Sequence, residues 1–270
     1  MSAGLATRAL SKRFPARDGG EPVRALEGVE MKIGSGEFVS IVGPSGCGKS
    51  TLFNILAGLD RPSGGEILLG GRRADRLLGE IGYMPQHDLL MPWRTVLDNA
   101  ALGLEMNGVA KREARSRVRE ELPRFGLEGF EDAWPARCSG GMRQRAALLR
   151  TFLAGREVML LDEPFGALDA LTRQVMQEWL LEIWQQDRKT ILFVTHDVEE
   201  ALFLSDRVYV MSGRPGRVVR EIEVDLPRPR ALEQTTTDPR FIELKAKLLE
   251  PLREEAAAQL EGPVAGPEAA

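Results

Sequence analysis

One nine-residue segment has the residue types and spacing of a polyphosphate-binding loop. It consists of Gly43, Pro44, Ser45, Gly46, Cys47, Gly48, Lys49, Ser50 and Thr51. Glycines let the backbone approach a polyphosphate closely, so that successive N–H groups can donate to its oxygens. The lysine adds a point charge for the β- and γ-phosphates, and the serine hydroxyl can bind Mg²⁺.

The flanking residues predict the elements that must position this loop. Residues 37–42 (EFVSIV) are rich in apolar and β-branched types and indicate a buried strand, whereas residues 51–57 (TLFNILA) indicate a helix. A helix that begins at the loop presents its positive end to the same anion. The alternative, a chance glycine turn before a core helix, is disfavoured by this strand–loop–helix context.

Two further buried strands end in polar residues that could do chemistry. Residues 158–161 are apolar throughout, as in a parallel strand covered on both faces, and Asp162 and Glu163 follow. Beside a phosphate loop, two such acids favour a metal ligand followed by a general base, although a strand entering a polar turn is the alternative. Residues 190–195 lead in the same way to His196. A lone histidine is more often structural, but the ends of parallel strands are where ligand sites lie.

Three weaker signals accompany these strands. Ser139, Gly140 and Gly141 open a helix, and a glycine pair suits a helix N-terminus that touches an anion. Phe14, upstream of the loop, could stack on an adenine ring or belong to the core. The apolar segment from Leu89 to Trp93 would ordinarily be core, or it could be a docking surface for a partner helix.

Composition bounds the class of protein. The chain has 270 residues, of which 43% are hydrophobic and 28% charged, so it can form a large α/β core with a subdomain. Its net charge of −4 gives no global basic surface for nucleic acid. No run approaches the ~18 apolar residues of a membrane span, and the N-terminus lacks a signal-peptide pattern. Cys47 and Cys138 are too few for a disulfide framework, so we expect reduced thiols in a cytosolic protein.

Periodicity predicts the remaining elements. We expect short strands in residues 5–33 around a turn at 17–20, a strand at 81–86, and helical structure from Val96 to about Phe125. Within that helical stretch the apolar residues Ala114, Val118 and Leu122 recur on one face, and its arginines favour a solvated face over an anion-binding patch. The helix that follows Glu163 should be core-facing, through Leu171, Val175, Leu180 and Ile183, with Met176 and Trp179. A terminal helix spans about 238–260, and residues 262–270 should be disordered.

The order of these segments carries a family resemblance. The phosphate loop, residues 83–86, residues 139–144, the strand to Asp162, residues 166–169 and His196 follow one another along the chain. With this set of motifs, the sequence resembles the ATP-binding subunit of ABC transporters over about residues 5–220. The resemblance implies an α/β fold, a P-loop NTPase (RecA-like) core with a small antiparallel β subdomain and an inserted α-helical subdomain. The core would comprise residues 1–90 and 157–230, the helical subdomain residues 91–156, and a C-terminal helical extension with a disordered tail residues 231–270.

The same resemblance implies a role for each motif residue toward ATP and Mg²⁺. Phe14 would stack on adenine, while Lys49, Ser50 and Thr51 hold phosphates and metal. Gln86 would touch the metal and the attacking water, Asp162 would organise Mg²⁺, Glu163 would polarise the water, and His196 would contact the γ-phosphate. The residues assigned to the nucleotide of a second protomer, or to communication with that protomer, are Ser139, Gly140, Gly141, Gln144 and Asp169.

The resemblance also implies partners. Two such chains would pair head to tail around two ATP molecules, and separate membrane permease subunits would receive the motion, with the Leu89–Trp93 segment as the docking groove. A solute-binding protein would act indirectly, and the chain would lie peripherally on the cytoplasmic face of the inner membrane. Residues 90–93, 162–169 and 212–217 resemble the nitrate/sulfonate/taurine importer group, which includes a pyrimidine (thiamine-precursor) branch. Cys138 stands where the family usually has leucine, and we expect it to pack rather than to touch ATP.

Two rival classes fit the residues less well. A soluble ABC-type ATPase without a membrane partner usually carries long coiled coils or two cassettes per chain, and this chain has neither. A P-loop GTPase or kinase would leave the Ser139–Gly141 stretch without a purpose, and no Asn-Lys-x-Asp base-reading motif is present.

Overall fold

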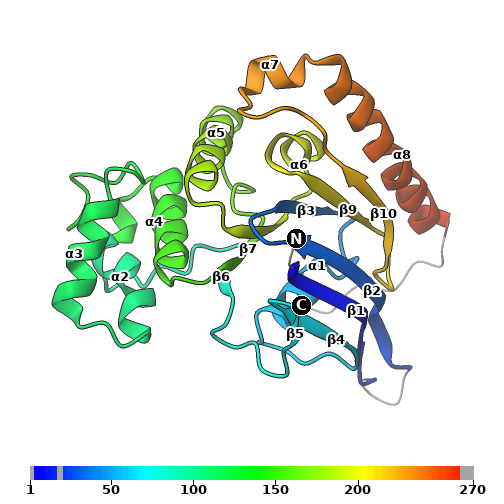
Figure 1. Ribbon diagram of the computed structural model, residues 1–270, viewed down its shortest axis with the longest axis horizontal. Helices are drawn as coiled ribbons and strands as arrows, with labels where there is room; N and C mark the ends of the chain where they lie inside the picture. Colours follow the sequence, from blue (N-terminus) through cyan, green and yellow to red (C-terminus); the bar gives the residue numbers. More distant parts are fainter. Residues whose placement is uncertain (1–2, 17–20, 262–270) are drawn as a thin grey trace.

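The central element is a six-stranded sheet, described here from a computed structural model that covers residues 3–16 and 21–261 (Figure 1). Its strand order is β10-β9-β3-β8-β7-β6. Five strands run parallel: β3 (Phe38–Val42), β6 (Gly82–Met84), β7 (Val158–Asp162), β8 (Thr190–Val194) and β9 (Arg207–Met211), and β10 (Val218–Glu223) is antiparallel to β9. Every residue of β3, β7 and β8 is buried, which explains their unbroken apolar patterns.

A second, antiparallel sheet lies beside the first, with strand order β2-β1-β4-β5. Its strands are β1 (Ala3–Phe14), β2 (Val23–Gly34), β4 (Gly64–Leu69) and β5 (Arg72–Arg73). The prediction of short strands was wrong, because β1 and β2 each run for 12 residues. Residues in the positive-φ region, Ala9 and Gly28, lie where the register shifts, so they bulge the ladder without ending it. The predicted turn at 17–20 lies outside the described residues.

Four helical segments form a lobe beside the sheets, at the left of Figure 1. They are α2 (Val96–Met106), α3 (Lys111–Glu121), the 3₁₀ turn η1 (Pro135–Arg137) and α4 (Gly140–Leu153). The single helical stretch expected from 96 to 125 is therefore two helices, and Gly108, with φ of 84°, lies in the break between them. The predicted apolar face of α3 is confirmed, since Ala114 and Val118 are fully buried.

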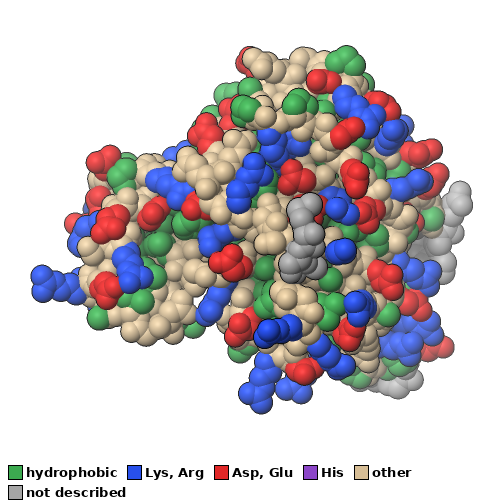
Figure 2. Space-filling view, in the orientation of Figure 1, with side chains coloured by type: hydrophobic (Ala, Val, Ile, Leu, Met, Phe, Trp, Pro, Cys, Tyr) green, Lys and Arg blue, Asp and Glu red, His purple; other side chains and the backbone are tan. Residues whose placement is uncertain are grey.

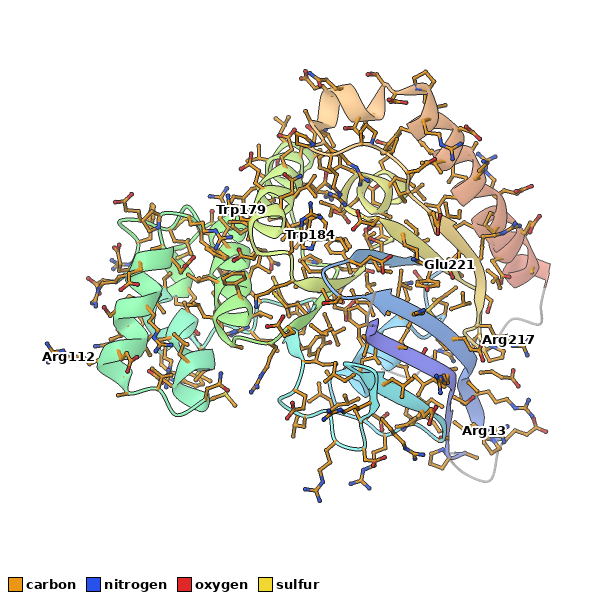
Figure 3. All side chains as sticks on the ribbon, in the orientation of Figure 1. Arg13, Arg112, Trp179, Trp184, Arg217 and Glu221 are labelled. Carbon is orange, nitrogen blue, oxygen red and sulfur yellow. The ribbon has the colours of Figure 1, made fainter. Side chains whose placement is uncertain are left out.

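The charged face of α3 behaves as a solvated surface. Figure 3 shows Arg112 pointing away from the rest of the molecule. Arg115 forms a bidentate ion pair with Asp98 of α2: its Nε and Nη2 donate to the two carboxylate oxygens at 2.7 and 2.8 Å. These arginines therefore lie at the edge of the lobe, as the sequence predicted.

Helix α5 (Ala170–Asp187) faces the core with only part of the face that was expected. Leu171 and Val175 are 76% and 56% exposed, so their prediction as core residues was wrong. The buried face includes Met176, Leu180 and Ile183, as predicted, together with Leu181 and Trp184. At 3.6 residues per turn, the nine positions from Leu171 to Leu180 make about two and a half turns, so these two residues lie on opposite sides of the helix and cannot both face the core. Figure 3 shows Trp179 and Trp184 on this helix.

The C-terminal segments pack onto the core. The last two helices are α7 (Leu232–Thr236) and α8 (Pro239–Glu261). Two further helices belong to the core, α1 (Lys49–Leu56) and α6 (Val198–Leu204). The predicted terminal helix is thus confirmed, and residues 262–270 lie outside the described part. Phe241, Leu244 and Leu248 of α8 are buried in one apolar cluster with Ala201 and Leu202 of α6 and with β9. Glu255 of α8 also accepts a hydrogen bond from the N–H of Gly213 at 2.8 Å.

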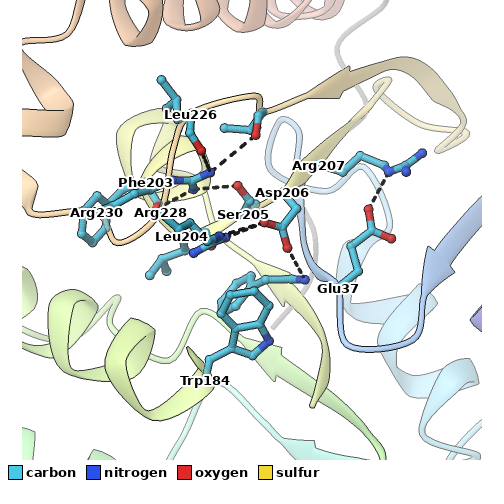
Figure 4. A network of polar contacts seen from close by, with 12 residues as sticks. Glu37, Trp184, Phe203, Leu204, Ser205, Asp206, Arg207, Leu226, Arg228 and Arg230 are labelled. Atoms are coloured by element: carbon cyan, nitrogen blue, oxygen red, sulfur yellow. Dashed lines mark hydrogen bonds and ion pairs between the residues drawn. The ribbon is translucent and has the colours of Figure 1, made fainter. Parts of the chain in front are cut away.

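A buried arginine closes the end of α6, as Figure 4 shows. The guanidinium of Arg230 is 7% exposed and donates through Nη1 to the carbonyls of Leu202, Phe203 and Ser205 at 2.8–3.1 Å. Burial lowers its pKa to about 9, which still leaves it protonated at neutral pH. Because the last carbonyls of a helix have no intrahelical partner, Arg230 satisfies groups that would otherwise be buried and unpaired.

The surface mixes both signs of charge. Figure 2 shows acidic and basic side chains interspersed over the lobe and the sheets on this face. Within residues 3–16 and 21–261, none of the helices combines the length and the apolar character that a membrane span needs.

Candidate nucleotide site

The predicted chemical residues come together at one edge of the main sheet. Strands β6, β7, β8 and β3 are neighbours and parallel, so their carboxyl ends share that edge. Gln86 follows β6, Asp162 and Glu163 end β7, His196 follows β8, and the phosphate loop follows β3. Ligand sites of parallel sheets form at such edges.

The phosphate loop is held by close contacts that only glycine permits. Gly48 caps α1 with φ of 101°, and a Cβ there would lie 2.8 Å from Cδ2 of Leu26. The turn at 212–217 braces the other side: a Cβ on Gly216 would lie 2.0 Å from the carbonyl oxygen of Cys47. The loop is therefore fixed between β2 and this turn.

Lys49 is folded back on its own loop. Its side chain is 8% exposed, and Nζ donates to the carbonyls of Gly43 and Pro44 at 2.8 and 3.0 Å. Ser50 is exposed on the first turn of α1 and Thr51 is half-buried. The exposed tip of the loop comprises Ser45 and Gly46, and Nη2 of Arg214 approaches Gly46 from the 212–217 turn.

Asp162 is a buried acid with a strongly perturbed titration. It is 6% exposed, and burial, with a smaller contribution from the charge of Glu163, raises its pKa to about 6. The hydroxyl of Tyr83 donates to its Oδ2 at 3.5 Å and opposes that shift. Burial raises the pKa of Tyr83 to about 12, so it stays a donor. A buried carboxyl group whose ionisation costs free energy is typical of a functional site, because a bound cation would stabilise its charged form.

Glu163 is the meeting point of three strand ends. Its Oε2 lies 3.3 Å from Nε2 of Gln86 and 3.3 Å from Nδ1 of His196. Its backbone has φ of 45°, uncommon for a residue with a side chain, and its N–H donates to the carbonyl of Val194 at 3.0 Å. A backbone held in this sparsely populated region is a feature that clusters at functional sites.

Phe14 lies at the end of β1, and the structure favours a surface position over the core. It is 38% exposed, and Nζ of Lys12 lies 4.8 Å from the centre of its ring. A stiff exposed ring is suited to stacking on a planar base, so its role toward adenine stays a prediction with a compatible geometry.

The Ser139 turn lies at the helical lobe and faces α5. Ser139 caps α4, its Oγ accepting from the N–H of Met142 at 3.3 Å. Cβ atoms on Gly140 and Gly141 would lie 3.4 Å from Leu168 and Thr172, on either side of Asp169. Asp169 itself caps α5 by accepting from Thr172.

Two residues near this turn are buried. Gln144 is 6% exposed, and its Oε1 has no hydrogen-bond partner among the described residues. Cys138 is also 6% exposed, and burial raises the pKa of its thiol, so it packs as expected.

The Leu89–Trp93 segment is partly exposed and rigidly held. Leu89 and Trp93 are 63% and 71% exposed, whereas Leu90 is buried, so the segment is not ordinary core. Asn99, fully buried in α2, accepts from the N–H of Met91 at 2.7 Å and donates to three carbonyls of residues 91–95. The structure thus presents two apolar side chains on a braced loop.

The donor set fits Mg²⁺. The side chains at the site are a hydroxyl (Ser50), an amide (Gln86) and a buried carboxylate (Asp162), all oxygen donors of the kind Mg²⁺ prefers. Among the described residues, no three of the His, Cys, Asp and Glu side chains cluster as a metal cage. This agrees with an ion held by few carboxylates, here Asp162 alone, together with neutral oxygen donors and substrate phosphates.

Sequence reasoning missed several supporting residues. Tyr83 and Arg173 contact Asp162 and Asp197, which lie far away in the chain, and Asn99 braces the loop at residues 91–95; a single sequence gives no signal for these contacts. For Tyr83 alone, its position in a strand that ends beside the acids could have indicated its contact.

Comparison with known proteins adds a family match. The family model described as "ABC transporter" matches residues 26–166. An uncharacterized ABC transporter ATP-binding protein of Methanocaldococcus jannaschii is 44% identical over 260 residues, covering 96% of this chain and 95% of that protein. A taurine import ATP-binding protein of Rhizobium johnstonii is 46% identical over 247 residues, with 92% of each chain covered. A solved dimeric structure of an ATP-binding cassette with ADP and Pi has a TM-score of 0.72 and 32% identity, covering 83% of this chain and all of that one.

Proposed function

We propose that this chain powers a solute importer. The premise is that it belongs to the ABC transporter family, as an ATP-binding subunit with ATPase activity. The α/β cassette fold predicted from the sequence is confirmed by the same comparisons. The observation that carries the proposal is the arrangement around Glu163, where Gln86 and His196 meet one carboxylate beside a phosphate loop.

The proposed chemistry assigns one task to each side chain. Lys49 leaves its loop carbonyls to bind the β- and γ-phosphates, and Phe14 stacks on adenine. Glu163 accepts a proton from the attacking water, Gln86 contacts that water, and His196 contacts the γ-phosphate. Mg²⁺, held by Ser50, Gln86 and Asp162, would supply charge neutralisation on the phosphates.

Head-to-tail pairing of two copies would complete the site. Gly140 and Gly141 face α5 rather than the phosphate loop of their own chain, which leaves the Ser139 turn available to a nucleotide bound by a partner. The solved dimer of a similar cassette with ADP and Pi supports the pairing of two copies. Loss of the shared phosphate would let the halves separate, so that hydrolysis becomes a rigid-body movement.

Separate membrane subunits would receive this movement. Leu89 and Trp93 are exposed on a braced loop and offer an apolar anchor for a helix of such a subunit. The chain would then lie on the cytoplasmic face of the membrane, and a solute-binding protein would act from the other side. Similarity to a taurine import protein supports a sulfonate-type solute, and a nitrate or pyrimidine-precursor solute is the alternative within the same importer group.

A substitution at the general base tests the chemistry. Glu163→Gln should bind ATP and hydrolyse it about 10²–10⁴-fold more slowly, because it cannot accept a proton. Glu199→Gln, the same change on an exposed glutamate of α6, is the matched control and should keep normal turnover. Normal turnover in Glu163→Gln would remove this residue from the role.

Mixing two inactive variants tests the shared site. Lys49→Ala and Ser139→Arg should each abolish turnover alone, and a mixture should regain part of it, since one of the two sites in a mixed dimer combines an intact Lys49 with an intact Ser139 turn. A mixture as inactive as its parts would contradict pairing.

Trp93→Ala should lose co-purification with permease subunits while the isolated chain keeps its ATPase activity. Unchanged co-purification of Trp93→Ala would instead favour a soluble ATPase or another docking surface.

A further inference from the structure

Arg173, at the end of the first turn of α5, contacts two segments near the candidate site. Its Nη2 donates to the carbonyl of Leu168 at 3.0 Å, one residue before Asp169. Its Nη1 lies 3.9 Å from Oδ2 of Asp197, one residue after His196. Its Nε is buried and has no hydrogen-bond partner in the described residues. We infer that Arg173 is a positioning residue that couples the Leu168–Asp169 turn to the His196 segment.

Each of the two segments is internally stiff. In the first, Gly166 N–H donates to the carbonyl of Glu163 and Leu168 N–H to that of Phe165, both at 3.1 Å. In the second, Oδ1 of Asp197 accepts from the N–H groups of Glu199 and Glu200 at 2.9 and 3.2 Å and so caps α6. A segment braced in this way moves as a unit, so a contact at its edge can transmit a displacement.

Arg173 also lies directly behind the reacting groups. A small cavity beyond the carboxyl ends of β7 and β8 is lined by Arg173 together with Glu163, Phe165, Gly166, Thr195, His196, Asp197 and Glu200. Arg173 therefore shares one cavity with Glu163 and His196, and its guanidinium contacts Leu168 and Asp197, which follow these two residues in the chain. When His196 moves toward a γ-phosphate, Asp197 moves with it. Through its ion pair with Asp197, Arg173 is displaced as well, and its hydrogen bond to the Leu168 carbonyl transmits the displacement to the Leu168–Asp169 turn.

The neighbouring contact between the same helices serves as an internal control. One turn along α5, Nε2 of Gln177 donates to Oε1 of Glu200 in α6 at 2.9 Å. Both residues are buried, at 5% exposure each, and burial raises the pKa of Glu200. This pair holds α5 against α6 but does not touch the Leu168–Asp169 turn. A purely structural role for the helix contact would make the two sites equivalent.

The coupling predicts an effect on turnover rather than on affinity. Arg173 touches none of the loop, lysine or aromatic groups assigned to the nucleotide, so its loss should leave KM for ATP unchanged. A misplacement of catalytic groups by about 1 Å can cost about 10²-fold in rate, and loss of one of several positioning contacts should cost about tenfold in kcat. This inference rests on the proposed catalytic role of Glu163.

The experiment is a set of steady-state ATPase measurements on the full chain, each with its thermal unfolding midpoint. Arg173→Met should lower kcat about tenfold at unchanged KM, and Arg173→Lys, which keeps the charge, should recover part of it. Gln177→Met should lower the unfolding midpoint but keep kcat. Asp197→Asn keeps the cap acceptor and removes the charge, so the double variant with Arg173→Met should be no slower than Arg173→Met alone.

Three outcomes would overturn the inference. They are an unchanged kcat in Arg173→Met, an equal loss of kcat in Gln177→Met, and additive losses in the double variant. Glu163→Gln in the same assay separates the two levels of the argument: if it stays slow while Arg173→Met is normal, the coupling is wrong and the proposed function stands. If Glu163→Gln turns over normally, the proposed function itself fails.

Discussion

Replacing the buried acid at the site should make the nucleotide-free protein more stable. Asp162 has its pKa raised from 3.8 to about 6, mainly by burial. A pKa difference between folded and unfolded chains is a free-energy difference of about 1.4 kcal/mol per unit, so ionising Asp162 costs the fold about 3 kcal/mol. Asp162→Asn has nearly the same shape and no charge, and should regain up to that amount at neutral pH.

The sign of the pH dependence follows from the same shift. Because the folded chain binds the proton of Asp162 more tightly than the unfolded chain, this stabilisation is complete below about pH 4 and is lost as pH rises to about 6. The stability of the wild type relative to Asp162→Asn should therefore fall between about pH 4 and 6 and stay level above.

Urea unfolding without nucleotide, and with a chelator present, measures this difference at each pH. Asp162→Asn should at the same time lose ATPase activity, because the proposed metal ligand is weakened. If Asp162→Asn were less stable than the wild type at pH 8, or if the difference did not change between pH 4 and 6, the burial argument would be refuted. Tyr83→Phe offers a control of opposite sense, since losing its hydroxyl should raise the pKa of Asp162 further.

Three other substitutions test the supports of the site. Gly216→Ala should weaken ATP binding measured by calorimetry, because its Cβ would collide with the carbonyl of Cys47, whereas Gly64→Ala, with open space around it, should be neutral. Arg230→Met should lower the free energy of unfolding by about 3 kcal/mol, since it leaves several buried carbonyls unsatisfied, and an unchanged urea midpoint would contradict that role. Phe14→Ala should weaken ATP binding by about 1–3 kcal/mol while Phe14→Trp retains it, and equal affinities would show that the ring does not stack.

The sequence predicted those features that are encoded locally. An unbroken apolar run such as residues 158–161 specifies a strand buried on both faces, and residues 43–51 specify their own loop and helix. Because parallel strands share one edge, the order of strands and polar residues along the chain was enough to predict that the chemical groups gather there. The same reasoning gave the amphipathic face of α3, where Ala114 and Val118 are buried.

What the sequence did not predict depends on which side of a helix faces the core and on contacts between separate elements. The α5 error arose because apolar residues on opposite sides of one helix, Leu171 and Leu180, were assigned to a single face. Glu163 gives no local sign of its positive φ, which the surrounding turn and the Val194 carbonyl impose. Asn99 and Arg173 have meaning only through the loops they touch.

The closure of α6 by Arg230 sets where this protein can be divided or joined to another. The motif residues end at His196, yet the helix that follows them is completed only by a guanidinium 27 and 28 positions beyond the carbonyls of Phe203 and Leu202. Glu255 then ties α8 back to the turn that braces the phosphate loop. A shortened version ending at the last motif would lose both ties, so a reporter or an affinity handle belongs beyond residue 261, where neither would be cut.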